Sequence, residues 1–523
     1  MCGRYSDGGD LKCGMNLCCS YYGWCGTDEL HCGNPDPNGL APCQAGFGLC
    51  QIIPPPTCDP SAASANGRSI GYYQASNTND RLCNRIAPSQ IITTGLTHLY
   101  FAFAEIDPTS FAVVVANAGD EDRYAQFNKL QTSSLKTWIA IGGFDFSDPG
   151  PTRTTWSDLA STPENRASFI SSVKAFMAKY GFQGVDLDWE YPATPQRGGR
   201  AEDTENYVSL VEEMRAAFGD QYGLSITLAP DYWYLRGFDA KAMEPYVDFF
   251  GFMAYDLHGF WDADIPTLGP IVRGQTDIRE IYNDTLPLWF DALNPAKINF
   301  GLALYGRGYT LANPSCNQMG CQYTGPSLPG PCTNFAGVLS LTEIQTYITD
   351  KGLTPELISE AMMKQITWED QWIGYDDLDT VAMKKKWASG YCFGGTMVWS
   401  VDFDSGTGSV APHRATAVVD LHFAVTDASQ DLASQELRPL MGHVDLPLKM
   451  LYVVPGLEDH AVRQQAIVAP PMLFAAAIAS LALATIRQMT LDLLAMFGLI
   501  PASGQVQIQL STAYRHVSTS YPH

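Results

Sequence analysis

The sequence is poor in charged residues, and in basic ones above all. Only 17% of its 523 residues are charged, and 55 Asp and Glu against 32 Lys and Arg leave a net charge of −23. This charge repels the phosphates of nucleic acids and of anionic lipid surfaces, so we expect neither as a partner. A neutral polymer such as a polysaccharide remains compatible, because its recognition depends on aromatic faces and hydrogen bonds.

Three further patterns are missing. The first residues carry no basic and apolar signal-peptide pattern. No G-x-G-x-x-G comes after the first expected strand, which disfavours an open dinucleotide-binding sheet. An uncharged run over 466–486 is broken near its start by Pro470 and Pro471. The stretch beyond these prolines is short for a bilayer, so we expect a buried or amphipathic helix there in preference to a membrane span.

Cysteine, in contrast, is concentrated at one end. Eight of the 14 cysteines lie within the first 50 residues. This density indicates a small scaffold held by disulfides. The adjacent Cys18 and Cys19, and the lack of a clean pair of C-x-x-C knuckles, disfavour zinc. Disulfides require an oxidising compartment, so we expect a secreted protein, extracellular or in a cell wall, whose secretion signal lies upstream of this sequence.

The composition divides the chain into four parts. A proline run at 54–56 and a stretch of small residues after it read as a linker. We therefore expect a disulfide-rich module at 1–51, a linker at 52–66, a main domain at 67–425 and a C-terminal tail at 426–523. The sequence assigns no role to the tail.

Apolar runs of strand length recur eight times in the main domain and alternate with helical periodicity. Alternating strands and helices predict a parallel sheet, and eight such units favour a closed (β/α)8 barrel over an open doubly wound sheet. The last interval is long and rich in Gly, Pro and Cys, which predicts an α+β insertion at about 310–380. The expected strands are 69–74, 97–106, 136–144, 184–191, 224–232, 247–258, 298–309 and 394–404.

The fourth of these runs carries three acidic residues at alternate positions. Asp186, Asp188 and Glu190 share one face of the strand, and the apolar residues between them share the other. In isolation, such a strand would present a solvated acidic face. Helices cover the outside of a parallel barrel, however, so here the carboxyl groups must point inward. Three carboxyl groups about 7 Å apart in a partly desolvated interior cannot all ionise without a large cost in free energy, so at least one must hold a proton near neutral pH. A carboxylic acid with a raised pKa is what the cleavage of a glycosidic bond requires, and Glu190 lies nearest the mouth.

These residues resemble a known family. Residues 184–192 resemble the active-site strand of family 18 glycoside hydrolases, the chitinases, whose pattern is D-x-x-D-x-D-x-E. Residues 140–143 resemble the family's S-x-G-G, residues 253–256 its M-x-Y-D, and residues 394–399 the end of its eighth strand. The resemblance covers about residues 66 to 415, and the long insertion, with Trp372, Gly374, Tyr375, Asp376 and Asp377, is similar to that of fungal chitinases related to killer-toxin subunits.

The resemblance implies hydrolysis of β-1,4-linked N-acetylglucosamine with retention, assisted by the acetamido group of the substrate. Glu190 would first protonate the glycosidic oxygen and then act as a base toward water. Asp188 would orient the acetamide and stabilise the oxazolinium ion, and Asp186 would share a proton with Asp188. Tyr255 would hydrogen-bond the acetamide carbonyl oxygen.

The family also implies the residues that hold the sugar. Trp399 would stack under the pyranose ring, and Asp256, Met253 and Tyr73 would complete the substrate-binding set. Neither a metal nor a cofactor is implied. Two positions depart from the family pattern: Gln183 replaces its first Asp, and Ala140 replaces its Ser. The Gln removes a charge, which can change the pKa values of the row without removing the acid.

The N-terminal module resembles the hevein-type chitin-binding domain. Ser20, Tyr22, Trp24 and His31 occupy the positions of that family's Ser and three sugar-contacting aromatic residues. His31 replaces an aromatic residue but can still present a flat ring. The family pattern implies the bridges Cys2–Cys19, Cys13–Cys25, Cys18–Cys32 and Cys43–Cys50. Of the other six cysteines we expect only Cys58 and Cys83 to pair.

Together these patterns predict a secreted, monomeric chitinase with an attached chitin-binding domain, acting on chitin and chito-oligosaccharides. A non-catalytic chitin lectin on the same scaffold is one alternative, although the loss of Glu190 that would mark it has not occurred. An endo-β-N-acetylglucosaminidase that acts on glycoproteins is the other. The chitin-binding module disfavours it, because an anchor of this kind raises the local concentration on an insoluble polymer.

Overall fold

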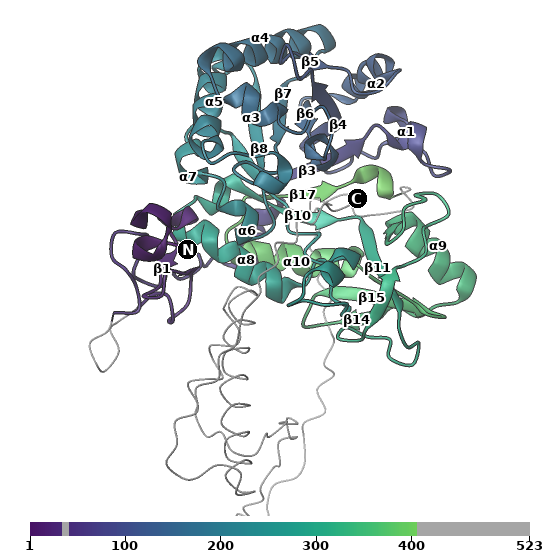
Figure 1. Cartoon of the computed structure of the whole chain (residues 1–523). Helices are drawn as coiled ribbons and strands as arrows, with labels where there is room; N and C mark the ends of the chain where they lie inside the picture. Colours follow the sequence, from purple (N-terminus) through teal and green to yellow (C-terminus); the bar gives the residue numbers. More distant parts are fainter. Residues whose placement is uncertain (34–40, 405–523) are drawn as a thin grey trace, which may run out of the picture. The chain divides into compact units, whose positions relative to one another are not determined.

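The computed structural model describes residues 1–33 and 41–404, and its largest part is built around eight parallel strands (Figure 1). In chain order these are β3 (Arg68–Gln74), β4 (His98–Ile106), β6 (Lys136–Gly142), β7 (Gly184–Asp188), β8 (Gly223–Leu228), β9 (Phe249–Phe252), β10 (Ile298–Ala303) and β17 (Gly395–Trp399). Each strand pairs with its neighbours in parallel, and β3 pairs with both β17 and β4. The sheet is therefore closed, which confirms the predicted barrel and excludes the open sheet.

Most of the barrel strands are shorter than the apolar runs that predicted them. The run at 184–191 forms a strand only as far as Asp188, and the run at 247–258 forms a strand only over 249–252. The apolar sequence continues past the last ladder hydrogen bonds because these residues remain buried in the loops above the barrel. Glu190 consequently lies just beyond the end of β7 and not on it.

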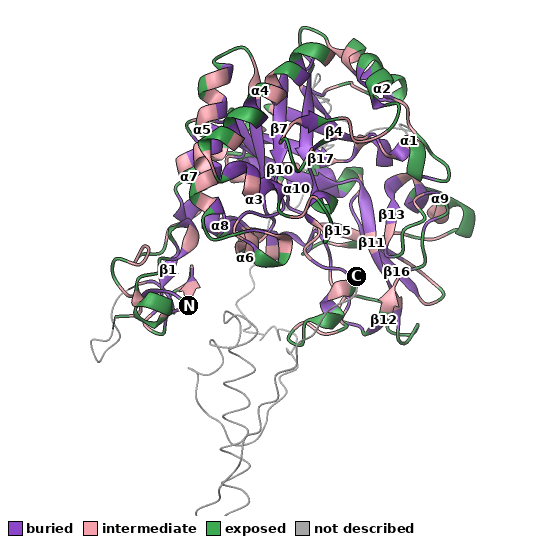
Figure 2. Ribbon diagram, turned by 45° about the horizontal axis from the view of Figure 1, so that its top comes forward, coloured by how far each residue is buried: buried purple, intermediate pink, exposed green. Residues whose placement is uncertain are grey.

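Helices cover the outside of the barrel, with buried strands inside and exposed helical faces outside (Figure 2). The long helices are α2 (Asp120–Phe127), α4 (Pro163–Tyr180), α5 (Asp203–Phe218), α8 (Ile278–Phe290) and α10 (Leu378–Gly390); α3 (Thr155–Ala160) is shorter, and α1 (Asn77–Asp80), α6 (Tyr232–Leu235) and α7 (Ala240–Met243) are single turns.

Helix α4 shows why this sequence is helical. Thr162 caps its start by accepting a hydrogen bond from the Asn165 N–H, and Pro163 occupies the first turn. Gly181, at φ 85°, ends it in the left-handed conformation. The side chains of Phe169 and Val173, four residues apart, face the barrel and are fully buried.

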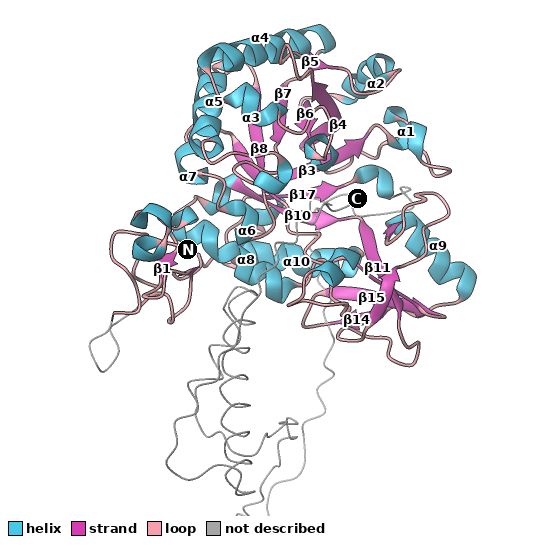
Figure 3. Ribbon diagram, in the orientation of Figure 1, coloured by secondary structure: helices cyan, strands magenta, loops and turns pink. Residues whose placement is uncertain are grey.

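The predicted insertion lies between β10 and β17 and is a second sheet (Figure 3). Its strands are antiparallel, and helix α9 (Leu341–Lys351) begins directly after its third one, with Ser340 and Glu343 forming a capping box at the helix start. The strands are β11 (Tyr305–Leu311), β12 (Tyr323–Pro326), β13 (Val338–Ser340), β14 (Glu356–Ile358), β15 (Met363–Trp368) and β16 (Gln371–Tyr375).

The N-terminal module has little regular structure and is held by disulfides. A short antiparallel pair, β1 (Cys18–Cys19) and β2 (Cys25–Gly26), is its only sheet among the residues described. Its four bridges join Cys2 to Cys19, Cys13 to Cys25, Cys18 to Cys32 and Cys43 to Cys50. This is the pairing that the hevein-type pattern implies.

The expected pair Cys58–Cys83 is wrong. Cys58 bonds Cys392 at the end of α10, 334 residues later, and Cys83 bonds Cys332 in the insertion, 249 residues later. Closure of the barrel brings the chain segment before β3 next to the segment before β17, so distant cysteines become neighbours in space. The remaining pair, Cys316–Cys321, closes a short loop within the insertion.

Some sequence-based expectations fall outside the described residues. The tail expected at 426–523, with its uncharged run at 466–486, is among them. Within residues 1–33 and 41–404, no helix combines the length and the apolar character needed to cross a bilayer.

Candidate active site

Three carboxyl groups project into the barrel at its carboxyl-terminal end. Asp186, Asp188 and Glu190 are 1%, 4% and 7% exposed. Asp186 accepts hydrogen bonds from Ser225 Oγ at 2.5 Å and from Tyr72 Oη at 2.7 Å. Asp188 accepts one from Thr227 Oγ1 at 2.6 Å. Strands β3 and β8 therefore hold the first two carboxyl groups in place.

Burial raises the pKa values along the row. Burial, opposed by the hydrogen bonds from Ser225 and Tyr72, raises the pKa of Asp186 to about 6. Burial, followed by the charges of Glu190 and Asp186, raises the pKa of Asp188 well above its ordinary value. Burial raises the pKa of Glu190 to about 7. Near neutral pH the row therefore holds protons, with Glu190 able both to give and to take one.

Two tyrosines complete the polar surroundings of the acid. The Tyr191 hydroxyl hydrogen-bonds the Glu190 carboxyl group, and the Tyr191 ring stacks on Tyr234 of α6 with centroids 4.2 Å apart. Tyr255, just after β9, is 7% exposed, and its pKa is raised by burial and then by the charge of Asp188. Tyr255 therefore keeps its proton and can act as a donor beside the carboxyl row.

Asp256 is held in a network that the sequence did not indicate. Its Oδ1 accepts hydrogen bonds from Tyr305 Oη and from Arg307 Nε, both at 2.6 Å. Both partners lie on β11, the first strand of the insertion, and the Arg307 guanidinium lies 4.5 Å from the ring centroid of Trp261. The insertion thus supplies the Arg307 cation and the Tyr305 ring to the edge of the site, and the loop after β9 supplies Trp261.

An aromatic floor lies at the end of β17. Trp399 is partly exposed, stacks with Phe103 at a centroid distance of 5.6 Å and lies 5.5 Å from Tyr72. Met253 lies just beyond strand β9 and is 7% exposed. Trp399 therefore keeps part of its surface exposed, whereas Met253 is buried.

Tyr73 does not belong to this site, contrary to the sequence-based expectation. Its side chain is 0% exposed, its hydroxyl donates to the carbonyl of Ile86, and its ring packs against Phe101 and Phe127. Alternation along β3 turns Tyr73 toward the helices and Tyr72 toward the barrel interior. Tyr72, one position earlier in β3, is the residue that reaches Asp186, and the sequence did not indicate it.

Two glycines bring the end of β6 close to β7. Gly142 and Gly143 have φ angles of 103° and 89°, and the Gly143 N–H donates to the carbonyl of Asp188 at 2.9 Å. A Cβ on Gly142 would lie 2.3 Å from that same carbonyl oxygen. The Gly-Gly pair therefore permits a close backbone approach that any side chain would block.

The two departures from the family pattern differ in position. Ala140 on β6 lies beside Asp186 in the strand register, where Ser225 and Tyr72 already supply two hydroxyl donors. Gln183 is exposed before the start of β7, and its Oε1 accepts from the Thr137 N–H. It lies at the opposite end of the barrel from Glu190, so it does not face the carboxyl row.

The expected sugar-binding residues of the N-terminal module are not equally exposed. Tyr22 is 65% exposed and Trp24 is partly exposed. Ser20 is 4% exposed, and its Oγ accepts from the Trp24 N–H. His31 is 7% exposed, with Nδ1 2.7 Å from Asp28 and its ring against Gly26. The His31 ring is therefore packed within the module and does not present the expected flat face.

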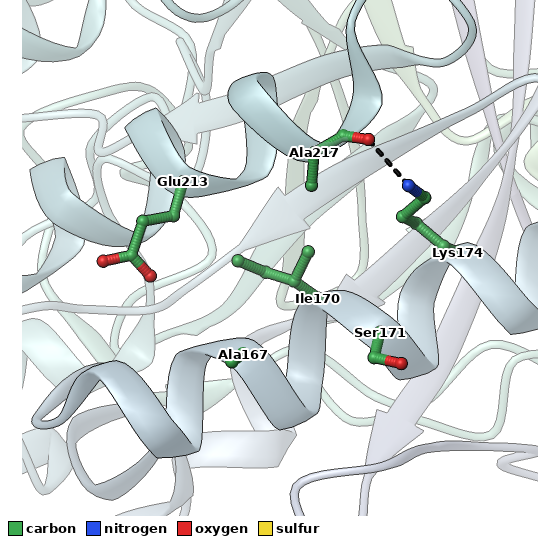
Figure 4. Close-up of a pocket in the computed structure, with 6 residues that line it drawn as sticks. All are labelled: Ala167, Ile170, Ser171, Lys174, Glu213 and Ala217. Atoms are coloured by element: carbon green, nitrogen blue, oxygen red, sulfur yellow. Dashed lines mark hydrogen bonds between the residues drawn. The ribbon is translucent and has the colours of Figure 1, made fainter.

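A groove on the outside of the barrel has no part in this arrangement (Figure 4). It lies between α4 and α5 and is lined by Ala167, Ile170, Ser171, Lys174, Glu213 and Ala217. Lys174 Nζ donates to the carbonyl of Ala217 at 2.7 Å, and Glu213 pairs with Arg166. Its charged groups are satisfied locally, and it lies on the helical face away from the strand ends.

Comparison with known proteins gives matches to both parts of the chain. Residues 68–404 match glycosyl hydrolases family 18, and residues 1–47 match the chitin recognition protein family. The chain is 31% identical over 423 residues to a Penicillium expansum protein named probable chitinase LysM11, covering 73% of this chain and 36% of that one. It is 29% identical over 341 residues to mouse chitotriosidase-1, covering 62% of this chain and 70% of that one. It is 27% identical over 413 residues to the killer toxin subunits alpha/beta of Kluyveromyces lactis, covering 75% of this chain and 33% of that protein. The chain thus spans about a third of the length of the two fungal relatives.

Solved structures agree with the fold. Catalytic domain 2 of the Ostrinia furnacalis Group II chitinase superposes with a TM-score of 0.59 at 24% identity, over 65% of this chain and 91% of that one. A mutant of a class V chitinase from the plant Cycas revoluta, solved with (GlcNAc)3, superposes with a TM-score of 0.56 at 27% identity, over 65% of this chain and 96% of that one. With its barrel, its carboxyl row and a family match over residues 68–404, this chain belongs to glycosyl hydrolases family 18.

Proposed function

We propose that this chain is a secreted chitinase that cleaves the β-1,4 links of N-acetylglucosamine polymers with retention, with Glu190 as the acid and base. The observation that carries the proposal is the buried carboxyl row, in which burial raises the pKa of Glu190 to about 7. A glycosidase acid must hold a proton at the pH of the reaction and then lose it.

The proposed reaction uses the groups in their order along the row. Glu190 protonates the glycosidic oxygen while the acetamido carbonyl oxygen of the sugar on its non-reducing side attacks the anomeric carbon. Asp188 receives the acetamide N–H and stabilises the resulting positive ring, and Asp186 shares its proton with Asp188. Tyr255 donates to the acetamide oxygen, and Trp399 supports the sugar ring. Glu190, now ionised, removes a proton from the water that opens the oxazolinium ion.

The N-terminal module would hold the enzyme on insoluble substrate through Tyr22 and Trp24. Tethering raises the local concentration of the barrel at the polymer surface without any new contact in the active site. This role favours chitin over glycoproteins as the substrate. It would also operate in a non-catalytic lectin, so binding alone does not separate the two functions.

The deciding experiment measures the release of soluble N-acetylglucosamine oligomers from colloidal chitin together with the fraction of protein that pellets. It compares the disulfide-intact wild type, Glu190→Gln and Tyr22→Ala. We expect release by the wild type, a loss of about 10³-fold in Glu190→Gln with unchanged pelleting, and reduced pelleting in Tyr22→Ala with activity retained on soluble oligomers. Pelleting without release by the wild type would reject the hydrolase and leave a lectin.

A further inference from the structure

Arg197 occupies a position that the proposed reaction does not use. It lies seven residues after Glu190 and ends η9 (Pro195–Arg197), and its side chain is 10% exposed. Nε donates to the backbone carbonyl of Glu190 at 3.1 Å, and Nη1 donates to Asp148 Oδ1 at 2.5 Å. Nη2 donates to the carbonyl of Phe144. One guanidinium thus joins the loop after β6 to the segment after β7.

The same guanidinium also covers an aromatic ring. Its central carbon lies 3.7 Å from the ring centroid of Phe144, which is 51% exposed in η8 (Phe144–Ser147). The Phe144 ring therefore contacts the cation and still keeps about half of its surface exposed. Only a planar fork with five donors can bind two carbonyl groups and a carboxylate while lying flat on a ring, which Lys cannot reproduce.

The charge of Arg197 acts on the acid itself. Several polar and charged groups interact with the Glu190 carboxyl group through hydrogen bonds or charge. They are Asp188 on β7, Tyr191 and Arg197 after β7, Asp145 after β6, Tyr234 in α6, and Tyr255 and Asp256 after β9. Burial and the charges of Asp256 and Asp145 raise the pKa of Glu190, whereas Tyr191 and Arg197 lower it. Arg197 is the only cation in this set of described residues.

We propose that Arg197 is a positioning residue for the acid: its hydrogen-bonded fork fixes the loop after β6 against the segment that carries Glu190, and its charge sets the alkaline limit of the reaction. The inference rests on the proposed function. It separates two effects of one side chain. Its hydrogen-bonded fork fixes the two segments relative to each other, and its positive charge favours the ionised form of Glu190.

The test compares kcat and KM on chitotetraose, from pH 4 to pH 9, for the wild type and four variants. Arg197→Gln should raise KM several-fold and move the alkaline limb of kcat/KM upward by about half a pH unit, because the carboxyl keeps its proton longer without the cation. Arg197→Lys should raise KM but leave the limb in place, because it keeps the charge and loses the fork. Phe144→Ala should also raise KM and leave the alkaline limb of kcat/KM in place.

Arg200→Gln is the matched control, since Arg200 lies three residues along the same loop and pairs with Asp158 instead. It should change neither quantity. An alkaline limb that stays fixed in Arg197→Gln, or that moves equally in Arg200→Gln, would overturn the proposal. A purely structural role would lower activity at every pH without moving the limb.

A second readout does not require activity. Glu190→Gln is combined with Arg197→Gln and with Arg200→Gln, and the free energy of unfolding is measured against pH. The stabilisation gained from Glu190→Gln should keep growing to a higher pH in the Arg197→Gln background only, because the folded-state pKa of Glu190 is higher there. If the wild type releases no sugar, the proposed function fails, and this linkage measurement still decides whether Arg197 acts on Glu190.

Discussion

Replacing Glu190 with Gln should make the protein more stable in alkaline solution, although it removes the acid. Glu190 is 7% exposed, and burial raises its pKa from 4.5 to about 7. A carboxyl group whose pKa is higher in the folded than in the unfolded chain binds its proton more tightly when folded. Ionisation above the unfolded pKa therefore destabilises the folded state, and the loss grows until the pH passes the folded pKa.

The structure sets the size of this effect. One pKa unit corresponds to about 1.4 kcal/mol, so a difference between about 7 and 4.5 corresponds to about 3 kcal/mol. This cost is almost absent at pH 4, because Glu190 is protonated in both states, and is nearly complete at pH 8. The amide that replaces the carboxyl group in Glu190→Gln cannot ionise and still accepts the Tyr191 hydrogen bond, so the variant escapes the cost.

The measurement is guanidinium unfolding of the wild type and Glu190→Gln at pH 4, 6 and 8. We expect equal stability at pH 4 and a gain for the variant that approaches about 3 kcal/mol at pH 8. Glu360→Gln, at an exposed loop position, is the control and should show no such trend. Equal stability at pH 8, or a less stable Gln variant, would refute the claim that burial raises the pKa of Glu190 and makes its ionised form destabilising.

Two further substitutions test the surroundings of the row. Tyr72→Phe removes the 2.7 Å hydrogen bond to Asp186 and leaves Ser225 as its donor, so the pKa of Asp186 should rise further and kcat should fall by about tenfold; an unchanged kcat and pH profile would contradict this role. Gln183→Asp restores the acidic residue of the family pattern at the far end of the barrel, where the side chain meets Thr137. Its pH profile for kcat/KM should match that of the wild type, and a displaced limb would mean that charge at this end reaches the row.

The sequence predicted the barrel because its physical signal is local. Each strand is an apolar run, and the acidic alternation at Asp186 and Asp188 has meaning only if helices cover one face of the strand. The ends of the strands were less well predicted, since apolar residues continue into buried loops. The prediction of Tyr73 as a substrate-binding residue fails for a related reason: neighbouring residues of a strand lie on opposite faces, and Tyr72 is the one that faces the barrel interior.

Long-range pairings could not be read from the chain. The cysteines at 58 and 83 are close in sequence, yet they bond residues 334 and 249 positions away. The contacts of Arg197 with Phe144 and Asp148 depend on how two loops meet above the barrel. Such loops carry no repeating pattern of apolar residues from which these contacts could be predicted. His31 occupies the family position of a sugar-contacting ring, but Asp28, three residues earlier, draws it inward.

The Cys58–Cys392 bond has a mechanical consequence. It lies between the proline run and β3, and it joins the chain there to the end of α10. Tension applied through the linker therefore divides at Cys58 and enters the barrel through two attachments, at β3 and at the segment between α10 and β17. The pull on β3 is therefore smaller, and its hydrogen bonds to β17 and β4 are less readily broken one after another from its first residue. The disulfide thus shares the load that β3 would otherwise carry alone.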